Sequence, residues 1–272
     1  MPLSARVLDR ISAQIKKYTP ILNQAVTKDE NEANTSSIIR AMLCDVLGYD
    51  SFKDITAEKA IKGARADLAV VVDGTVRFLI EAKAVGISLK DRHVRQIVDY
   101  GANQGTDWVI LTNGVNWNLY KIHFGQPIGE NLLCEIDVLN STPKSAKLAE
   151  LIECFGNLSH ENFSTVSMNA YFEKKRLTSK FAVAAVLLSE PMLIEIRHKL
   201  RKMSPGLKVD VEYLEILLSN EVIKRELIDS DEGKAAQTLI KRLQKKLAKD
   251  REEKDPEEEG SDQPVVAGTT QS

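Results

Sequence analysis

Three charged residues stand out at the two ends of the segment 66–83, where Asp67, Glu81 and Lys83 have apolar neighbours. Placing charged side chains among apolar ones costs free energy unless a partner or a metal ion compensates the charge. Two carboxylates and a backbone carbonyl are hard oxygen ligands that suit Mg²⁺ or Mn²⁺. A metal held there would polarise a phosphodiester oxygen and lower the pKa of a bound water, and a nearby lysine would orient the water or stabilise negative charge. These residue types therefore indicate hydrolysis of a phosphodiester bond.

The elements around this set are predicted to be two strands of a hairpin. Apolar runs at 68–72 and 76–80 flank Asp73-Gly74, which is a strong hairpin signal. Because both runs are apolar at successive positions, we expect strands that are buried on both faces.

The register of this hairpin decides whether the two carboxylates share a face. Glu81 and Lys83 are two residues apart and so point to the same side of their strand. A regular two-residue turn would pair Asp67 with Ile80 and turn Asp67 away from Glu81. A three-residue loop or a β-bulge would place Asp67 opposite Glu81, and we predict one of these.

Further elements follow from hydrophobic periodicity. The N-terminal half is predicted to hold a helix over 4–17 that Pro20 interrupts, a helix that begins at a capping box at 27–30 and stops at Gly48, a helix over 91–103, and strands over 108–112 and 117–122. The C-terminal half is predicted to be helical near 146–155, 180–202 with a break at Pro191, 210–228 and 232–249. We therefore expect an α/β core with a C-terminal helical region.

Composition and charge divide the chain further. The 272 residues are 43% hydrophobic and 28% charged, as in ordinary globular domains, and no apolar run is long enough to span a membrane. Residues 250–272 contain eight acidic and two basic residues, so the net charge of this segment is −6. Because the whole chain has a net charge of −2, residues 1–249 have a net charge of +4. We predict a first domain over 1–140, a helical accessory region over 141–249 and a disordered acidic tail over 250–272.

The order Asp67, Glu81-Ala82-Lys83 resembles the PD-(D/E)XK nuclease signature. Its surroundings resemble the N-terminal nuclease domain of type I restriction enzyme R subunits. The similar segments are Glu32-Ala-Asn-Thr35, Leu47-Gly-Tyr-Asp50, Gln96-Ile-Val-Asp-Tyr100, Leu111-Thr-Asn-Gly114 and Trp117-Asn-Leu-Tyr120. The resemblance covers roughly residues 28–125 and implies a restriction-endonuclease-like core, with a mixed central sheet flanked by helices.

The resemblance also implies roles for individual residues. Asp67 and Glu81 would bind Mg²⁺ or Mn²⁺, and Lys83 would be the catalytic lysine. Glu32 would complete the site as the acidic residue of the first helix. Gln96 and Tyr100, one helical turn apart, would support the site or contact DNA. Without the resemblance, a salt-bridged hairpin end and a structural Gln–Tyr pair remain alternatives.

The resemblance implies a metal-dependent DNA endonuclease in a bacterial or phage cytoplasm. No G-x-x-x-x-G-K-[ST] loop occurs in the sequence, so this chain carries no P-loop motor of the kind that R subunits use. It is either a stand-alone relative or a nuclease component that works with other restriction-system or ATPase subunits. The alternative is a nuclease-like fold that binds nucleic acid or a partner protein without cutting, and RNA remains open as a substrate.

Several other residues have simpler interpretations. The three cysteines lack the spacing of a disulfide framework or a zinc site, which favours a reducing cytosol. We expect His93 to be an exposed helical histidine, and Trp108 and Trp117 to lie in the core. Basic clusters at 174–176, 197–202 and 241–246 are more commonly solvated helix faces than DNA-binding surfaces.

Overall fold

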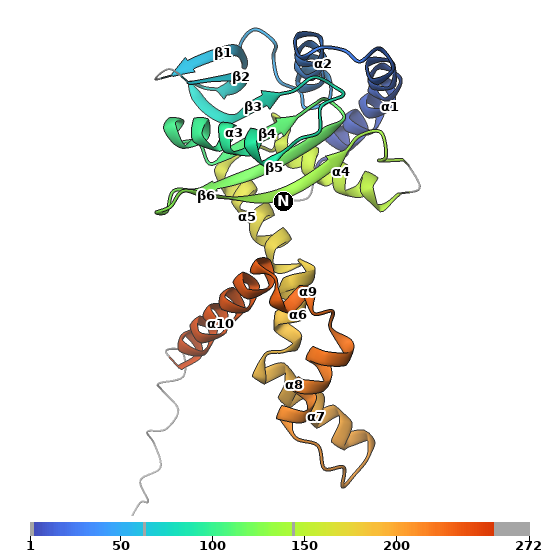
Figure 1. The fold of residues 1–272 in the computed structure, drawn as a ribbon, viewed down its shortest axis with the longest axis vertical. Helices are drawn as coiled ribbons and strands as arrows, with labels where there is room; N and C mark the ends of the chain where they lie inside the picture. The colour runs from blue at the N-terminus through green and yellow to red at the C-terminus, as the bar shows by residue number, and fades with distance from the viewer. Residues whose placement is uncertain (1–2, 62–63, 143–144, 253–272) are drawn as a thin grey trace, which may run out of the picture. The chain divides into compact units, whose positions relative to one another are not determined.

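The computed structural model describes residues 3–61, 64–142 and 145–252 (Figure 1). The chain divides into two compact units, Met1–Lys175 and Arg176–Ser272. Because the helices at 146–158 and 165–175 pack within the first unit, that unit extends beyond residue 140. The predicted division at 140 and 249 stays a prediction, and the acidic segment from residue 253 lies outside the described residues.

The first unit is built on a six-stranded sheet in which the strands follow their sequence order. The strands are β1 (Ile55–Ile61), β2 (Ala64–Val72), β3 (Thr75–Ala82), β4 (Trp108–Thr112), β5 (Asn116–His123) and β6 (Gly129–Asp137). Only β3 and β4 are parallel, and all other neighbours are antiparallel. The parallel pair requires a crossover, which α3 (Asp91–Gln104) supplies.

Helices cover both faces of this sheet (Figure 1). On one face α3 buries Val94, Ile97 and Val98 against apolar residues of β2 to β5. The other face packs against α1 (Ala5–Lys28), α2 (Glu32–Asp45), α4 (Ala146–Leu158) and α5 (Thr165–Leu177). The predicted restriction-endonuclease-like class, a mixed sheet flanked by helices with a C-terminal helical region, is confirmed.

The hairpin of β2 and β3 forms as predicted, and its irregularity is a β-bulge. Asp73 and Gly74 both have positive φ, as a tight two-residue turn requires. The register shifts between Val70 and Val71, beyond which Leu68 pairs with Ile80. The predicted bulge is therefore confirmed, and the three-residue loop offered beside it does not form.

Three features of the N-terminal part differ from the sequence expectation. Helix α1 runs through Pro20, because a buried stripe from Val7 to Ala25 packs on both sides of it and Pro20 itself is exposed. Helix α2 is capped by Asn31, whose side chain accepts from the amide of Asn34, and not by a capping box at 27–30. Strands β1 and β6 were not predicted, since neither has the continuous apolar run of the central strands.

The second unit is helical. It contains α6 (Lys180–Leu187), α7 (Glu190–Met203), α8 (Val211–Leu217), the π-helical turn η1 (Leu218–Val222), α9 (Glu226–Asp229) and α10 (Asp231–Glu252). The predicted break near Pro191 is found two residues earlier, because Pro191 occupies the first turn of α7, where it needs no intrahelical partner. The predicted helix over 210–228 is divided into three short pieces.

Two remaining observations concern the cysteines and the helices. Cys134 on β6 and Cys154 on α4 form a disulfide, although the cysteine spacing in the sequence indicated no disulfide framework. The sequence could not show this pairing because the two residues meet only when α4 packs on the sheet. Among the described residues, none of the helices has the length and apolar character needed to cross a membrane.

Candidate active site

Glu81 and Lys83 stand at the C-terminal end of β3, where the parallel pair with β4 ends. The amide of Lys83 extends this ladder by donating to the carbonyl oxygen of Thr112 at 2.8 Å. Nζ of Lys83 lies 2.6 Å from Oε1 of Glu81, so strand alternation places both side chains on one face. Glu81 is 1% exposed, and the side chain of Lys83 is 14% exposed. A carboxylate and an ammonium are therefore held together at the rim of the sheet core.

The β-bulge brings Asp67 to the same place. With the shifted register, Asp67 stands across from Glu81 on the neighbouring strand. The amide of Ala82 donates to Oδ2 of Asp67 at 2.7 Å, which fixes this half-buried carboxylate between Glu81 and Lys83. Without the bulge, alternation would turn Asp67 to the opposite face of the sheet.

Helix α3 adds Gln96 and Tyr100 to the set. Nε2 of Gln96 donates to Oε1 of Glu81 at 2.6 Å and lies 3.2 Å from the hydroxyl oxygen of Tyr100. Oε1 of Glu81 thus receives hydrogen bonds from both Lys83 and Gln96. The two helix residues orient the buried carboxylate, in line with the supporting role that the family resemblance implies.

Glu32 reaches the site from α2. Its Oε2 lies 3.8 Å from Nζ of Lys83, and its side chain is 53% exposed. Glu32 is also in the first turn of α2, where a carboxylate suits the helix dipole. All six residues predicted for the site therefore converge, and Glu32 is the most open of them.

Two buried hydrogen-bonding residues hold the loop that follows Lys83. Oγ1 of Thr35 on α2 accepts from the amide of Val85 at 3.2 Å. Nδ2 of Asn113, after β4, donates to the carbonyl oxygens of Val85 at 3.1 Å and Ile87 at 3.0 Å. The segments around Thr35 and Asn113 entered the family resemblance without a role. The structure shows them as positioning residues that tie α2 and β4 to the end of β3.

Burial and charge shift the acidity of the central pair. Burial raises the pKa of Glu81 to about 7, although the hydrogen bond from Lys83 opposes this rise. Burial alone would lower the pKa of Lys83, but its hydrogen bond to Glu81 and the charges of Glu81, Glu32 and Asp67 raise it. Lys83 is therefore held in its protonated form, while the charge of Glu81 is costly in the absence of further partners.

One oxygen of Glu81 lacks a hydrogen-bond partner within the described part of the chain, and this matters for whether a metal ion could bind here. Its second oxygen, Oε2, is buried and has no hydrogen-bond partner among the described residues. An ionised buried oxygen in this state needs a cation or a donor, and Asp67 offers a second hard carboxylate beside it. No group of three or more His, Cys, Asp or Glu side chains suited to a metal ion occurs among the described residues. The donor set fits a hydrated divalent ion, which keeps several waters and needs few protein carboxylates.

His93 differs from expectation. It is 6% exposed and is therefore not an exposed helical residue. Its Nδ1 lies 3.3 Å from the amide nitrogen of Lys90, and burial lowers its pKa. His93 is therefore a neutral structural residue beside the site. Trp108 and Trp117 are buried core residues, as predicted.

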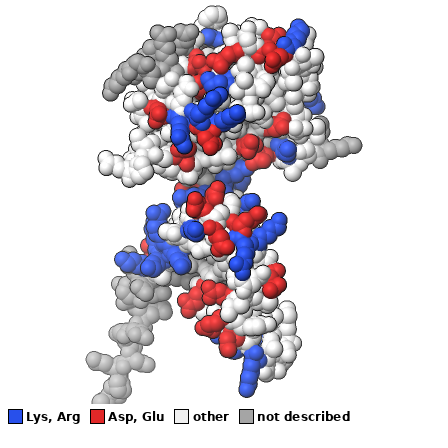
Figure 2. All heavy atoms as spheres, viewed as in Figure 1, with Lys and Arg blue, Asp and Glu red and all other residues white. Residues whose placement is uncertain are grey.

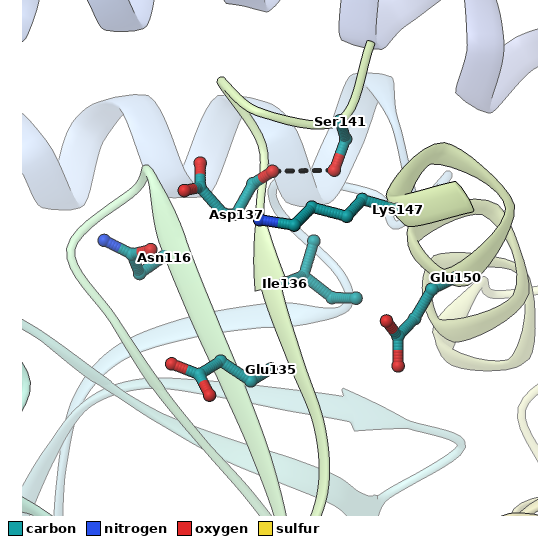
Figure 3. Close-up of a pocket in the computed structure, with 7 residues that line it drawn as sticks. All are labelled: Asn116, Glu135, Ile136, Asp137, Ser141, Lys147 and Glu150. Carbon is teal, nitrogen blue, oxygen red and sulfur yellow. Dashed lines mark hydrogen bonds between the residues drawn. The ribbon is translucent and has the colours of Figure 1, made fainter. Parts of the chain in front are cut away.

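A separate hollow lies between β5, β6 and α4 (Figure 3). Its polar lining includes Asn116, Glu135, Asp137, Lys147 and Glu150. None of the residues predicted for the site lines it. The candidate active site is therefore the open cluster at the end of β3, and not this hollow.

Comparison with known proteins supports the family assignment of the core. Residues 38–133 match the family described as type I restriction enzyme R protein N terminus (HSDR_N). This segment runs from α2 to β6 and contains Asp67, Glu81, Lys83 and Gln96. The resemblance that the motifs indicated is thus confirmed for this part of the chain. Neither a curated protein nor a solved structure matches the chain significantly.

Proposed function

We propose that this chain is a metal-dependent endonuclease that hydrolyses DNA phosphodiester bonds within a restriction system, with residues 1–140 as its nuclease domain. The premise is the similarity of residues 38–133 to the N-terminal region of restriction enzyme R proteins. The observation that carries the proposal is the buried carboxylate of Glu81, which is paired with Lys83 through Oε1 and has no partner at Oε2 among the described residues. The unpaired oxygen of this buried carboxylate is available to a metal ion, which would compensate its charge.

Asp67 and Glu81 would hold Mg²⁺ or Mn²⁺, with water completing its coordination. Such an ion supplies Lewis-acid polarisation of the phosphate and a water of lowered pKa. Lys83, kept protonated by its acidic neighbours, places a positive charge where negative charge develops on the phosphate. Gln96 keeps the Glu81 carboxylate in its rotamer, and Glu32, at the open side, would orient the attacking water. Water adds to phosphorus as the bond to the 3′ oxygen breaks, which leaves a 5′-phosphate and a 3′-hydroxyl.

Partners and setting are part of this proposal. Duplex DNA is the proposed substrate, and an ATPase or specificity subunit is a proposed partner because the sequence contains no P-loop. We propose a cytoplasmic setting, since restriction acts on DNA inside the cell. The disulfide between Cys134 and Cys154 lies on β6 and α4, away from the residues at the end of β3.

A plasmid-nicking assay with Mg²⁺ or Mn²⁺ tests the activity, with EDTA as the blank. Lys83→Ala is expected to lose cleavage and retain DNA binding, and Asp67→Asn is expected to lose Mn²⁺ binding. Lys53→Ala, which removes an exposed lysine of the same unit, is the matched control. Equal cutting by Lys83→Ala and the parent would refute the site. Metal binding without cutting by any form, even with added cell extract, would favour the non-cleaving module.

A further inference from the structure

Helix α10 of the second unit carries cations along one side. We define the α10 basic face as six exposed residues: Lys234, Lys241, Arg242, Lys245, Lys246 and Lys249. At 3.6 residues per turn, these side chains leave the helix within an arc of about 140°. Figure 2 shows Lys and Arg gathered over this helix.

The opposite side of α10 explains why this face stays open. Ala236, Leu239 and Ile240 are buried, and Ala236 and Ile240 cluster with Ala185 of α6. This apolar packing fixes the rotation of the helix about its axis. Because the apolar side of the helix is packed, the α10 basic face is held toward solvent.

The charges on this face lack compensation. None of the six residues takes part in an ion pair among residues 145–250, whose side chains the structure describes. Cations four residues apart, as at 241, 245 and 249 or at 242 and 246, repel one another and destabilise a helix. Lys241 and Lys245 border a groove that Glu212 and Glu215 also line, but Arg242, Lys246 and Lys249 do not. The outer row at 242, 246 and 249 is thus the most strongly unbalanced part.

We infer that the α10 basic face binds the phosphate backbone of duplex DNA, independently of sequence. With a rise of about 1.5 Å per residue, Arg242 to Lys249 spans about 10 Å, which is enough for these long side chains to reach neighbouring phosphates of one DNA strand. Release of counterions from the DNA supplies the driving force for such contacts. This inference rests on the proposed function in one respect, namely that DNA is the polyanion which the basic face binds. It assigns to the second unit a DNA-holding role in addition to the contacts that the candidate active site would make with its substrate.

The test is duplex binding by the full chain in EDTA, where cleavage cannot interfere. Fluorescence anisotropy with a labelled duplex of about 30 base pairs is followed from 50 to 200 mM KCl. The variant is Arg242→Gln/Lys246→Gln/Lys249→Gln, since glutamine has nearly the helix propensity of lysine and arginine. We expect about tenfold weaker binding at 100 mM KCl. The slope of log K against log salt should fall in magnitude by about 2 to 3, at about 0.9 per lost contact.

The control is Lys17→Gln/Lys174→Gln/Lys199→Gln, which changes the net charge equally. Each of these lysines already has an acidic partner, namely Asp45, Glu153 and Glu195. Its affinity and slope should stay close to those of the parent. Equal losses in both variants would show a net-charge effect and overturn the inference.

Unchanged binding by the α10 variant would also overturn it. Circular dichroism of both variants checks that the helices are intact. Because binding is measured in EDTA, a negative result for the α10 variant would not affect the nicking result for Lys83→Ala. Loss of nicking activity in all forms would likewise leave the binding result standing.

Discussion

Replacing Glu81 by glutamine should stabilise the metal-free protein at alkaline pH, although it removes a residue of the candidate site. In the folded protein the pKa of Glu81 is raised from 4.5 to about 7, chiefly by burial. The folded state therefore binds this proton more tightly than the unfolded state. Its contribution to stability is fully present below pH 4.5 and is lost as the pH rises through 7.

The expected size follows from this shift. At about 1.4 kcal/mol per pKa unit, a rise from 4.5 to about 7 corresponds to about 3 kcal/mol. Glutamine keeps the shape and stays neutral, so Glu81→Gln should match the parent near pH 4.5 and exceed it by up to about 3 kcal/mol at pH 8.5. For a unit of this size that is a rise in Tm of roughly 6 to 12 °C.

The assay is urea and thermal unfolding in EDTA at pH 5, 7 and 8.5, followed by tryptophan fluorescence. The chain has two tryptophans, and both Trp108 and Trp117 are buried in the first unit, so this signal reports the unit that holds the site. Glu130→Gln, at an exposed position on β6, is the control and should show no such pH dependence. A Glu81→Gln protein that is no more stable than the parent at pH 8.5, or equally stabilised at pH 5, would refute the reasoning.

Three further outcomes are expected. The affinity for Mn²⁺ should fall about tenfold per pH unit below pH 7, because Glu81 must lose its proton before it binds the metal. Calorimetry in two buffers should therefore show that binding releases about one proton at pH 6 and almost none at pH 8.5. A proton count that is the same at both pH values would contradict this. Gln96→Ala removes a hydrogen bond to that carboxylate and should move the pH midpoint of cleavage up by about one unit, whereas Asn103→Ala on the same helix should not. Asn113→Ala leaves two carbonyl oxygens unpartnered and should cost about 2 to 4 kcal/mol in urea unfolding, and a cost no larger than that of the exposed Asn140→Ala would count against its positioning role.

Sequence reasoning succeeded where local pattern and chemistry coincide. The hairpin at Asp73-Gly74 was predictable because few residues tolerate positive φ, and the buried strands because their apolar runs are continuous. The bulge followed from requiring Asp67 and Glu81 to share a face. Its position between Val70 and Val71 came only from the structure, since packing on both faces sets where the extra residue is tolerated.

Sequence reasoning failed where packing outweighs propensity. Pro20 lies within α1 because the buried residues on both sides of it stabilise the helix by more than proline costs. His93 is buried, although its helix position resembled an exposed one, because tertiary packing and not the local pattern decides its exposure. Strand β6 has a weak pattern, since several of its residues are exposed.

The sequence by itself determined the types of the residues at the candidate site, their order, and the alternation that puts Glu81 and Lys83 on one face. Through the family resemblance it also indicated that Glu32, Gln96 and Tyr100 belong to the site. Only the tertiary structure decided that Gln96 donates to Glu81, that Glu32 reaches Lys83, and that one oxygen of Glu81 is buried without a partner. These facts depend on burial and on contacts between distant elements. Such contacts decide how much free energy it costs to ionise a side chain, and they cannot be predicted from the local sequence pattern.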